Sequence, residues 1–163
     1  MNHFKLFHRF SYRYWISYFT LFNAKMELIH TGGNIMTRKA FNTKTVSSSG
    51  PYSHVTDAGD FLFFSGQTAK NRIDLEEDLT GDIAKQIEVA FNNLFDVMAD
   101  QGVSESDVVK VNVYLTTMKN FEAMNEVYKT KFSEPFPSRT CVAVYELPLG
   151  AEVEIEIIVK KQA

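Results

Sequence analysis

The chain has 163 residues, of which 45% are hydrophobic and 23% are charged. This composition is that of a folded globular protein with enough apolar residues for a core, and it excludes a disordered or fibrous chain. The single cysteine, Cys141, excludes an internal disulfide framework and a cysteine-rich zinc site. The net charge of −3 argues against a protein that binds the nucleic-acid backbone, which needs clustered Lys and Arg.

The amino-acid composition of the chain changes near Met36. Residues 1–35 hold four basic residues, one acid and nine aromatic side chains, a net charge of +3 that leaves −6 for residues 36–163. Four interpretations compete for the first segment: a transmembrane helix, a secretory signal, a mitochondrial presequence, and upstream sequence read from a start site placed too early. Arg9 and Arg13 interrupt the apolar run that a membrane span needs, and the small residues of a secretory cleavage site are missing. We favour the early start site, keep the presequence as an alternative, and predict one domain at residues 36–163.

The first elements of that domain are expected to be strands followed by a helix. The apolar run at residues 61–65 predicts a buried strand, and the polar residues 69–78 predict a loop. Apolar residues recur every three or four positions from Ile83 to Met98, which predicts a helix with one apolar face that ends before Gly102.

A strand, a second helix and two more strands are expected to follow. Alternation from Val108 to Leu115 predicts a strand. Asn120 can cap a helix that must end before Pro135. The apolar face of that helix is Phe121, Met124, Tyr128 and Phe132, and residues 139–145 and 152–159 then predict the last two strands.

This order predicts an α+β fold, with one mixed sheet and two helices packed on a single face. The other face would be open, with Val108, Tyr114 and Ile158 lying among polar groups. Sister chains could bury that face, so the pattern favours a homo-oligomer without fixing the number of subunits.

Charged residues in the last two strands are candidates for chemistry. Arg139 stands at the start of an otherwise apolar strand. It is either an edge residue in solvent, or its guanidinium binds a carboxylate or phosphate through two parallel hydrogen bonds. Glu152, Glu154 and Glu156 alternate along a strand and should share one face. They are either solvated, or one of them lies in a cleft facing Arg139 and positions a water molecule.

Three other residues have both a structural and a functional interpretation. Cys141 should share a strand face with Arg139, and we favour a small apolar core residue over a nucleophile. Tyr52 follows a Gly-Pro turn, where it could close a pocket or simply pack. His54 is the only histidine outside residues 1–35, so a Ser-His-Asp type arrangement would have to use it. The sequence has no metal or nucleotide motif.

Five segments, in order from about Met36 to Val159, resemble the Rid family (reactive intermediate/imine deaminases, formerly YjgF). They are Gly50-Pro51-Tyr52-Ser53, Phe64-Ser65-Gly66-Gln67, Asn125-x-x-Tyr128, Pro137-Ser138-Arg139-Thr140-Cys141-Val142 and Val153-Glu154-Ile155-Glu156. The resemblance implies a chorismate-mutase-like fold and a homotrimer with clefts between subunits. It also implies hydrolysis of 2-imino acids (2-iminopropanoate, 2-iminobutanoate and their enamine tautomers) to 2-keto acids and ammonia, without a cofactor.

The resemblance also implies roles for individual residues. Arg139 would bind the substrate carboxylate, and Glu154 would hold and activate the attacking water. The backbone at Cys141 would accept the proton of the imine nitrogen. The cleft would be lined by Tyr52, Ser65, Gly66 and Asn125, with Tyr52 or Asn125 coming from the neighbouring subunit.

Departures from the family occur at His54, where many members have Gln, and at Tyr145, where a smaller residue is common. The loop at 69–78 also lacks the usual Pro and Gly, and all three features could change the size of the cleft and its preferred imine.

Two other functions compete with the deaminase. In a non-catalytic module that binds a keto acid, Arg139 would suffice and Glu154 would be dispensable. A ribonuclease or translation inhibitor, an older label of the family, is disfavoured by the acidic charge and by the absence of a basic aromatic patch. We therefore expect a small-molecule substrate, and no nucleic acid or membrane partner. The expected location is the cytoplasm, or the mitochondrion if residues 1–35 are a presequence.

Overall fold

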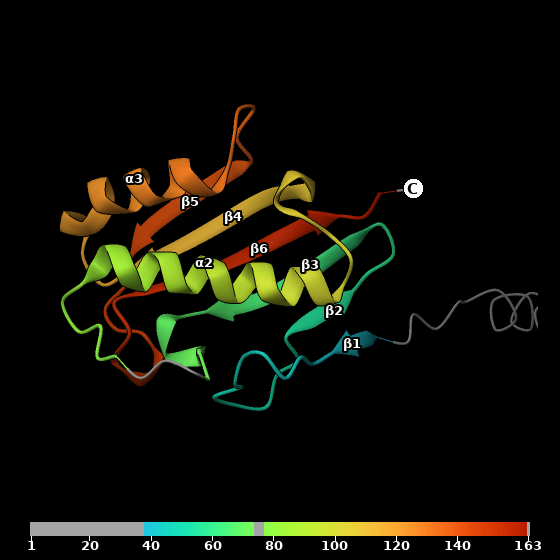
Figure 1. Cartoon of the computed structure of the whole chain (residues 1–163), viewed down its shortest axis with the longest axis horizontal. Helices are drawn as coiled ribbons and strands as arrows, with labels where there is room; N and C mark the ends of the chain where they lie inside the picture. The colour runs from blue at the N-terminus through green and yellow to red at the C-terminus, as the bar shows by residue number, and fades with distance from the viewer. Residues whose placement is uncertain (1–37, 74–76, 163) are drawn as a thin grey trace, which may run out of the picture. The chain divides into compact units, whose positions relative to one another are not determined.

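The computed structural model describes residues 38–73 and 77–162, and the predictions made for residues 1–35 lie outside them. In this part of the chain the strands form one six-stranded sheet, in the order β1-β2-β3-β6-β4-β5 (Figure 1). The strands are β1 Lys39–Phe41, β2 Val55–Asp57, β3 Phe61–Gln67, β4 Val108–Leu115, β5 Ser138–Ala143 and β6 Val153–Lys160. The β4–β5 pair is parallel and the other pairs are antiparallel, so the sheet is mixed, as predicted.

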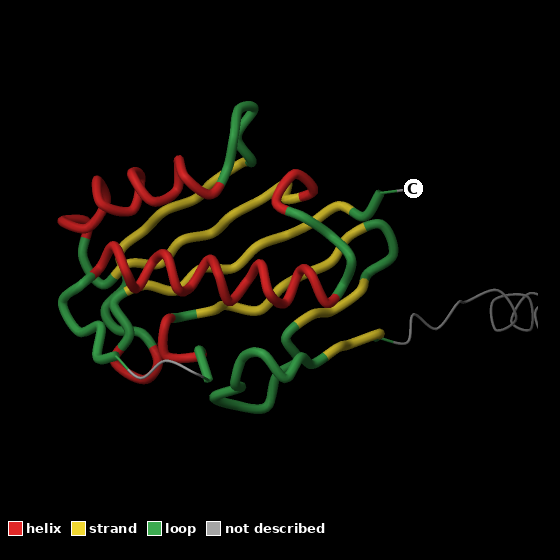
Figure 2. The backbone as a smooth tube through the Cα atoms, in the orientation of Figure 1, coloured by secondary structure: helices red, strands yellow, loops and turns green. Residues whose placement is uncertain are grey.

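Two helices, α2 (Ile83–Asp100) and α3 (Phe121–Lys131), cover one face of this sheet (Figures 1 and 2). Helix α2 begins at Asp82, whose carboxylate accepts a hydrogen bond from the backbone N–H of Lys85. Its predicted apolar face is buried, since Phe91 is fully enclosed and Met98 is 1% exposed. The predicted α+β class, with two helices on a single face, is confirmed.

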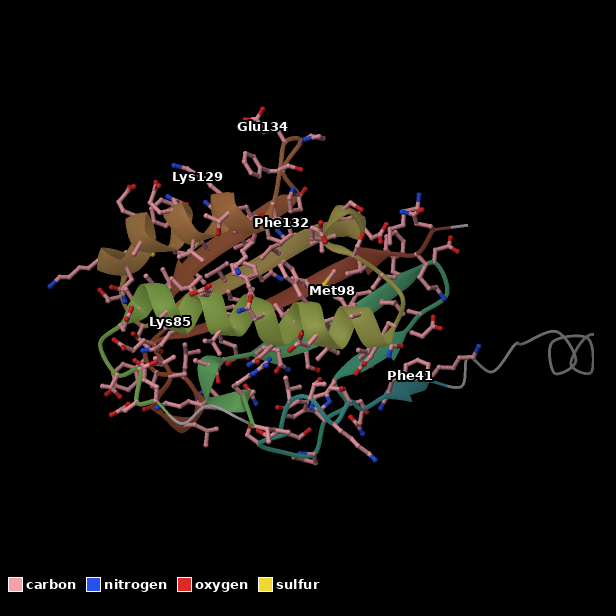
Figure 3. All side chains as sticks on the ribbon, viewed as in Figure 1. Phe41, Lys85, Met98, Lys129, Phe132 and Glu134 are labelled. Carbon is pink, nitrogen blue, oxygen red and sulfur yellow. The ribbon has the colours of Figure 1, made fainter. Side chains whose placement is uncertain are left out.

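Three residues of the face predicted for α3 are buried, Met124, Tyr128 and Phe132, whereas Phe121 is only partly buried. This face meets α2 through aromatic rings. Phe91 of α2 contacts Tyr128 and Phe132 with ring centroids 6.0 and 5.6 Å apart, in edge-to-face arrangements. Asn120 occupies the residue before α3, as predicted, but its side chain makes no capping hydrogen bond. Figure 3 shows Phe132 at the end of α3 and Glu134 at the tip of the loop that leads to β5.

The alternation predicted for β4 is wrong at its first two residues. Val108 pairs with Val159 of β6, and Lys110 pairs with Ile158, so the register shifts between them. This irregularity inserts one extra residue, which reverses the order of faces on one side of it. Val108 therefore lies in the core, 7% exposed, and Val109 is 38% exposed. Only Tyr114 and Ile158 keep the predicted place on the open face.

The run at residues 61–65 is not a fully buried strand, because helices cover only one face of the sheet. Leu62 and Phe64 point to the helices and are each 3% exposed, whereas Phe61 and Phe63 are 39% and 45% exposed. Phe63 pairs with Ile158 of β6, so apolar surface gathers on the open face. The segment predicted as a loop begins with a turn of 3-10 helix, Ala69–Asn71, and the rest of it is partly outside the described residues.

The contacts of Phe91 make it the test of the helix–sheet core. We expect Phe91→Ala to lower the free energy of unfolding by about 3–5 kcal/mol, because a fully buried aromatic ring leaves a cavity between both helices and the sheet. Urea denaturation followed by far-UV circular dichroism measures this. Tyr145→Ala is the control, since that ring is 95% exposed, and its effect should stay within about 0.5 kcal/mol. Equal effects of the two substitutions would contradict the packing.

Candidate active site

Four of the predicted site residues line one cavity of about 160 Å³. They are Tyr52, Ser65, Gly66 and Glu154. Two hydrogen bonds fix Ser65 at this cavity. Its hydroxyl donates to the backbone oxygen of Ser53 at 2.7 Å, and its backbone N–H donates to the backbone oxygen of His54. The cavity thus brings together residues from β3, β6 and the turn before β2.

The carboxylate of Glu154 lies directly against the backbone of Gly66. A β-carbon added to Gly66 would stand 2.0 Å from Oε1 of Glu154 and 2.8 Å from its Cδ. The pairing of β3 with β6 is irregular at this point, between Phe64 and Gln67. Any other side chain at position 66 would displace the Glu154 carboxylate, so glycine is required here for a close approach rather than for a turn.

The three glutamates near the start of β6 have different partners. Glu156 accepts hydrogen bonds from Nδ2 of Asn112 at 2.8 Å and from the hydroxyl of Tyr114 at 2.9 Å. Glu152 precedes the strand, and its carboxylate accepts from Gln86 on the helix side. The prediction that all three share one face is therefore wrong for Glu152, because alternation holds only from the first paired residue of the strand.

Glu154 is the one of the three whose carboxylate accepts no hydrogen bond from the described residues. Burial raises the pKa of its carboxyl above the usual range, and the nearby charge of Glu156 raises it further. A carboxyl group with a raised pKa beside a cavity can hold a water molecule and take a proton from it.

A loop before β2 forms one wall of this cavity, and His54 holds it in place. Nδ1 of His54 accepts from the N–H of Thr43 at 3.0 Å, and Nε2 lies 2.9 Å from the hydroxyl of Ser48. Because both ring nitrogens are engaged, His54 serves as a structural residue rather than a catalytic base. The next residue, Ser49, donates its N–H to the hydroxyl of Tyr52 at 3.3 Å, which orients that ring at the cavity.

Arg139 and Asn125 lie in a second hollow, of about 410 Å³, between α3 and the edge strand β5. The guanidinium carbon of Arg139 lies 4.7 Å from the ring centre of Tyr128 and 5.7 Å from that of Phe121. Its Nη1 donates a weak hydrogen bond to Sδ of Met124 at 3.6 Å. Among the described residues no carboxylate forms an ion pair with it. Aromatic faces therefore orient the guanidinium while its N–H edges stay available to an anion.

Cys141 lies two residues along β5 from Arg139 and on the same face, as predicted, because the two residues pair with Val113 and Val111 of β4. Burial raises the pKa of the Cys141 thiol, and the charge of Arg139 opposes this only in part. The thiol is therefore protonated at neutral pH, which argues against a nucleophile.

Strand register separates the two groups of site residues within one copy of the chain. Arg139 pairs with Val111, whose side chain is fully buried under the helices. Glu154 pairs with Tyr114 on the opposite, open face. The structure therefore joins Tyr52, Ser65, Gly66 and Glu154 in one cavity, and places Arg139 with Asn125 elsewhere.

Some lining residues were not predicted from the sequence. Thr68 and Asn71 form the inner wall of the Glu154 cavity, where Oδ1 of Asn71 accepts from the N–H and the hydroxyl of Thr68. The Thr-x-x-Asn spacing was a visible signal of this reciprocal cap. Ser49, Pro148 and Leu149 complete the lining, and only the Pro-Leu-Gly sequence of a turn hinted at the last two.

Neither a membrane-spanning helix nor a metal-binding cluster is found among the described residues. None of the helices in residues 38–73 and 77–162 is long and apolar enough to cross a membrane. In the same ranges, no three His, Cys, Asp or Glu side chains gather closely enough to hold a metal ion.

Comparison with known proteins gives consistent matches over this domain. Residues 42–161 match the family model described as Endoribonuclease L-PSP. A protein of Dermatophagoides farinae named 2-iminobutanoate/2-iminopropanoate deaminase is 43% identical over 110 residues, which are 68% of this chain and 85% of that protein. The mitochondrial protein mmf2 of Schizosaccharomyces pombe is 37% identical over 126 residues, 76% of this chain and 98% of that protein. A crystal structure of RidA from an Antarctic Psychrobacter superposes with a TM-score of 0.67 at 34% identity, covering 76% of this chain and all of that chain.

The raised pKa of Glu154 makes the stability of the protein depend on pH. The folded protein holds this proton more tightly than the unfolded chain, so the stabilisation is complete below the unfolded pKa and is lost as pH rises through the folded pKa. We expect Glu154→Gln to raise Tm at pH 7, because it removes a half-buried charge, and the gain to shrink towards zero at a pH of about 4.

Glu156→Gln is the matched control for this measurement. Both hydrogen bonds go to one oxygen of Glu156, which an amide side chain keeps, so the same change there should move Tm at pH 7 less than Glu154→Gln does. Differential scanning calorimetry across this pH range measures both variants. A Glu154→Gln variant that melts lower than the wild type at pH 7 would contradict a half-buried carboxylate without a hydrogen-bond donor among the described residues.

Proposed function

Because the chain belongs to the Endoribonuclease L-PSP family, which includes the Rid proteins, we propose that it hydrolyses 2-imino acids to 2-keto acids and ammonia. The substrates are 2-iminopropanoate, 2-iminobutanoate and their enamine tautomers, and no cofactor takes part. The observation that carries the proposal is a half-buried carboxylate with a raised pKa, Glu154, beside a cavity of about 160 Å³. The deaminase name of a 43% identical relative supports the same chemistry.

The complete site is proposed to combine two copies of the chain. One copy contributes the Glu154 cavity, and its neighbour contributes Arg139, Asn125 and the backbone of Cys141. This division follows from the opposite sheet faces on which Arg139 and Glu154 lie. It assigns Tyr52 to the copy that carries Glu154, and Asn125 to the copy that carries Arg139.

The exposed apolar surface of the open face supports a closed homo-oligomer, and we propose the trimer of the family. Phe63 and Val142 are 45% and 42% exposed on that face, which also carries Ile158 and Tyr114. Apolar surface of this kind is usually covered in the native assembly, and a ring of identical subunits covers it with repeated copies of one interface.

The proposed reaction needs an oriented imine and one water molecule. Arg139 binds the substrate carboxylate with two parallel hydrogen bonds, which fixes the plane of the C=N group. Glu154 takes a proton from the water as its oxygen bonds to C2, and the C=N electron pair moves to nitrogen. The backbone carbonyl of Cys141 accepts the N–H of the substrate. Glu154 then passes the proton of the water to the nitrogen. The C–N bond breaks as the new hydroxyl gives up its own proton to the nitrogen, so ammonia leaves and the keto acid remains.

The raised pKa of Glu154 suits this role. A base is most effective when its pKa lies near the working pH, and burial moves this carboxyl in that direction. The protonated thiol of Cys141 has no part in the reaction, so the proposal uses only the backbone of that residue.

A module that only binds keto acids is the second candidate, because Arg139 in its aromatic setting could bind a carboxylate without Glu154. An RNA-cleaving activity is disfavoured by the negative net charge and by the carboxylates of Glu154 and Glu156, which would repel a phosphate backbone.

We propose the cytoplasm as the location of a chain that starts at Met36. A chain that keeps residues 1–35 would instead carry a basic, acid-poor segment suited to a mitochondrial presequence. N-terminal sequencing of the protein made from its native gene tests the early start site: residues retained before Met36 would contradict it.

The activity is tested with a threonine dehydratase that releases 2-iminobutanoate, whose loss is followed by trapping with semicarbazide. We expect the wild type to accelerate hydrolysis and Arg139→Ala to lower kcat/KM about 100-fold, since an interaction with the charged carboxylate is lost. Glu154→Gln should lower kcat about 100-fold or more, as expected for the loss of a general base.

Controls separate catalysis from binding in this assay. Glu126→Gln, which changes an exposed glutamate paired with Lys129, should behave as the wild type. Calorimetric binding of 2-ketobutyrate should be lost in Arg139→Ala and kept in Glu154→Gln. If the wild type binds the keto acid but does not accelerate hydrolysis, the protein is a binding module.

A further inference from the structure

Leu149 has a backbone conformation that leucine rarely adopts. Its φ is 58°, and among the described residues it is the one non-glycine residue with a positive φ. Gly150, which follows it, has a φ of 68°. A β-carbon crowds the backbone in this left-handed region, which glycine and asparagine adopt with less strain. The turn before β6 therefore carries leucine at a position where its backbone is strained.

The side chain of Leu149 gains no compensating burial within one copy of the chain. It is 61% exposed, although it is a large apolar group. It nevertheless lines the cavity that holds Glu154. Strained residues of this kind cluster at active sites and ligand clamps.

The lining of this cavity is divided into polar and apolar parts. The polar part consists of Glu154 with Ser49, Ser65, Thr68 and Asn71. The apolar part consists of Tyr52, Pro148 and Leu149. Any alkyl group that enters the cavity would be better placed against the apolar part, because the polar part binds water.

We propose that Leu149 is a specificity-determining residue that contacts the alkyl side chain of the substrate and favours longer straight-chain 2-imino acids. This inference rests on the proposed function. When the substrate C2 lies beside the water held by Glu154 and its carboxylate points to Arg139 of the neighbouring copy, the alkyl group is the remaining substituent. The apolar part of the cavity lining is then the surface that contacts this alkyl group.

The size of the effect follows from the area of contact. Each substrate methylene buried against the apolar part of the lining strengthens binding of the transition state about fourfold. The wild type should therefore show kcat/KM values that rise about fourfold per methylene from 2-iminopropanoate to 2-iminobutanoate and 2-iminopentanoate.

The test compares these three imines, generated from the corresponding amino acids by an amino-acid oxidase and trapped with semicarbazide. Leu149→Asn keeps a residue that tolerates a positive φ but removes the apolar surface, and Leu149→Gly relieves the strain and removes the side chain. Both variants should flatten the dependence on chain length to less than about twofold per methylene. Ile73→Ala is the control, since this isoleucine is equally exposed, does not line the cavity and should leave the dependence unchanged.

The outcomes separate this inference from the proposed function. If the wild type hydrolyses none of the imines, the proposed function itself fails. If the wild type is active and Leu149→Asn keeps the full dependence on chain length, the role of Leu149 is overturned. Size-exclusion chromatography with light scattering is run on every variant, because loss of the oligomer in Leu149→Asn would make this residue a subunit contact and would also overturn the inference.

Discussion

Neighbouring side chains along a β-strand point to opposite faces of the sheet, and in this protein that rule separates Arg139 from Glu154. The guanidinium lies on the face covered by α3, between the rings of Tyr128 and Phe121. The carboxylate lies on the open face, against Gly66. Because no rotamer of either side chain can pass through the sheet, a site that uses both residues requires a second copy of the chain. The proposed oligomer is thus tied to the proposed chemistry.

Two glutamates on the open face, Glu154 and Glu156, differ in their hydrogen-bond partners. Asn112 and Tyr114 satisfy Glu156, whereas Glu154 receives no such hydrogen bond from the described residues. The charge of Glu156 raises the pKa of Glu154 further, beyond the effect of burial. The absence of a side chain at Gly66 then lets the Glu154 carboxylate sit at the cavity instead of in solvent.

The sequence alone was sufficient for the elements with strong periodicity. Helix α2 and the apolar face of α3 were predicted correctly, because residues such as Phe91 and Tyr128 recur at the spacing of one helical face. The mixed sheet followed from the order of the elements. In contrast, the extra residue at Val109 carries no signal in its own side chain, since valine suits either face, and it moved Val108 into the core.

The candidate site was predicted by residue type but not by arrangement. Arg139 and Glu154 were identified from a charged residue in an apolar strand and from the family resemblance. Their distribution over two faces depends on pairing between strands far apart in the sequence, which local patterns do not contain. The backbone strain at Leu149 was also invisible, because only three-dimensional packing of the turn before β6 imposes it.

The central claim, that each site takes Glu154 from one copy and Arg139 from its neighbour, is tested most directly by complementation. Arg139→Ala and Glu154→Gln chains are co-expressed with different tags, the mixed oligomers are isolated, and imine hydrolysis is measured. In a trimeric ring with sites between neighbours, every mixed oligomer has intact residues at one of its three sites, so about a third of the wild-type activity should return. Mixed oligomers as inactive as either variant alone would contradict the shared site.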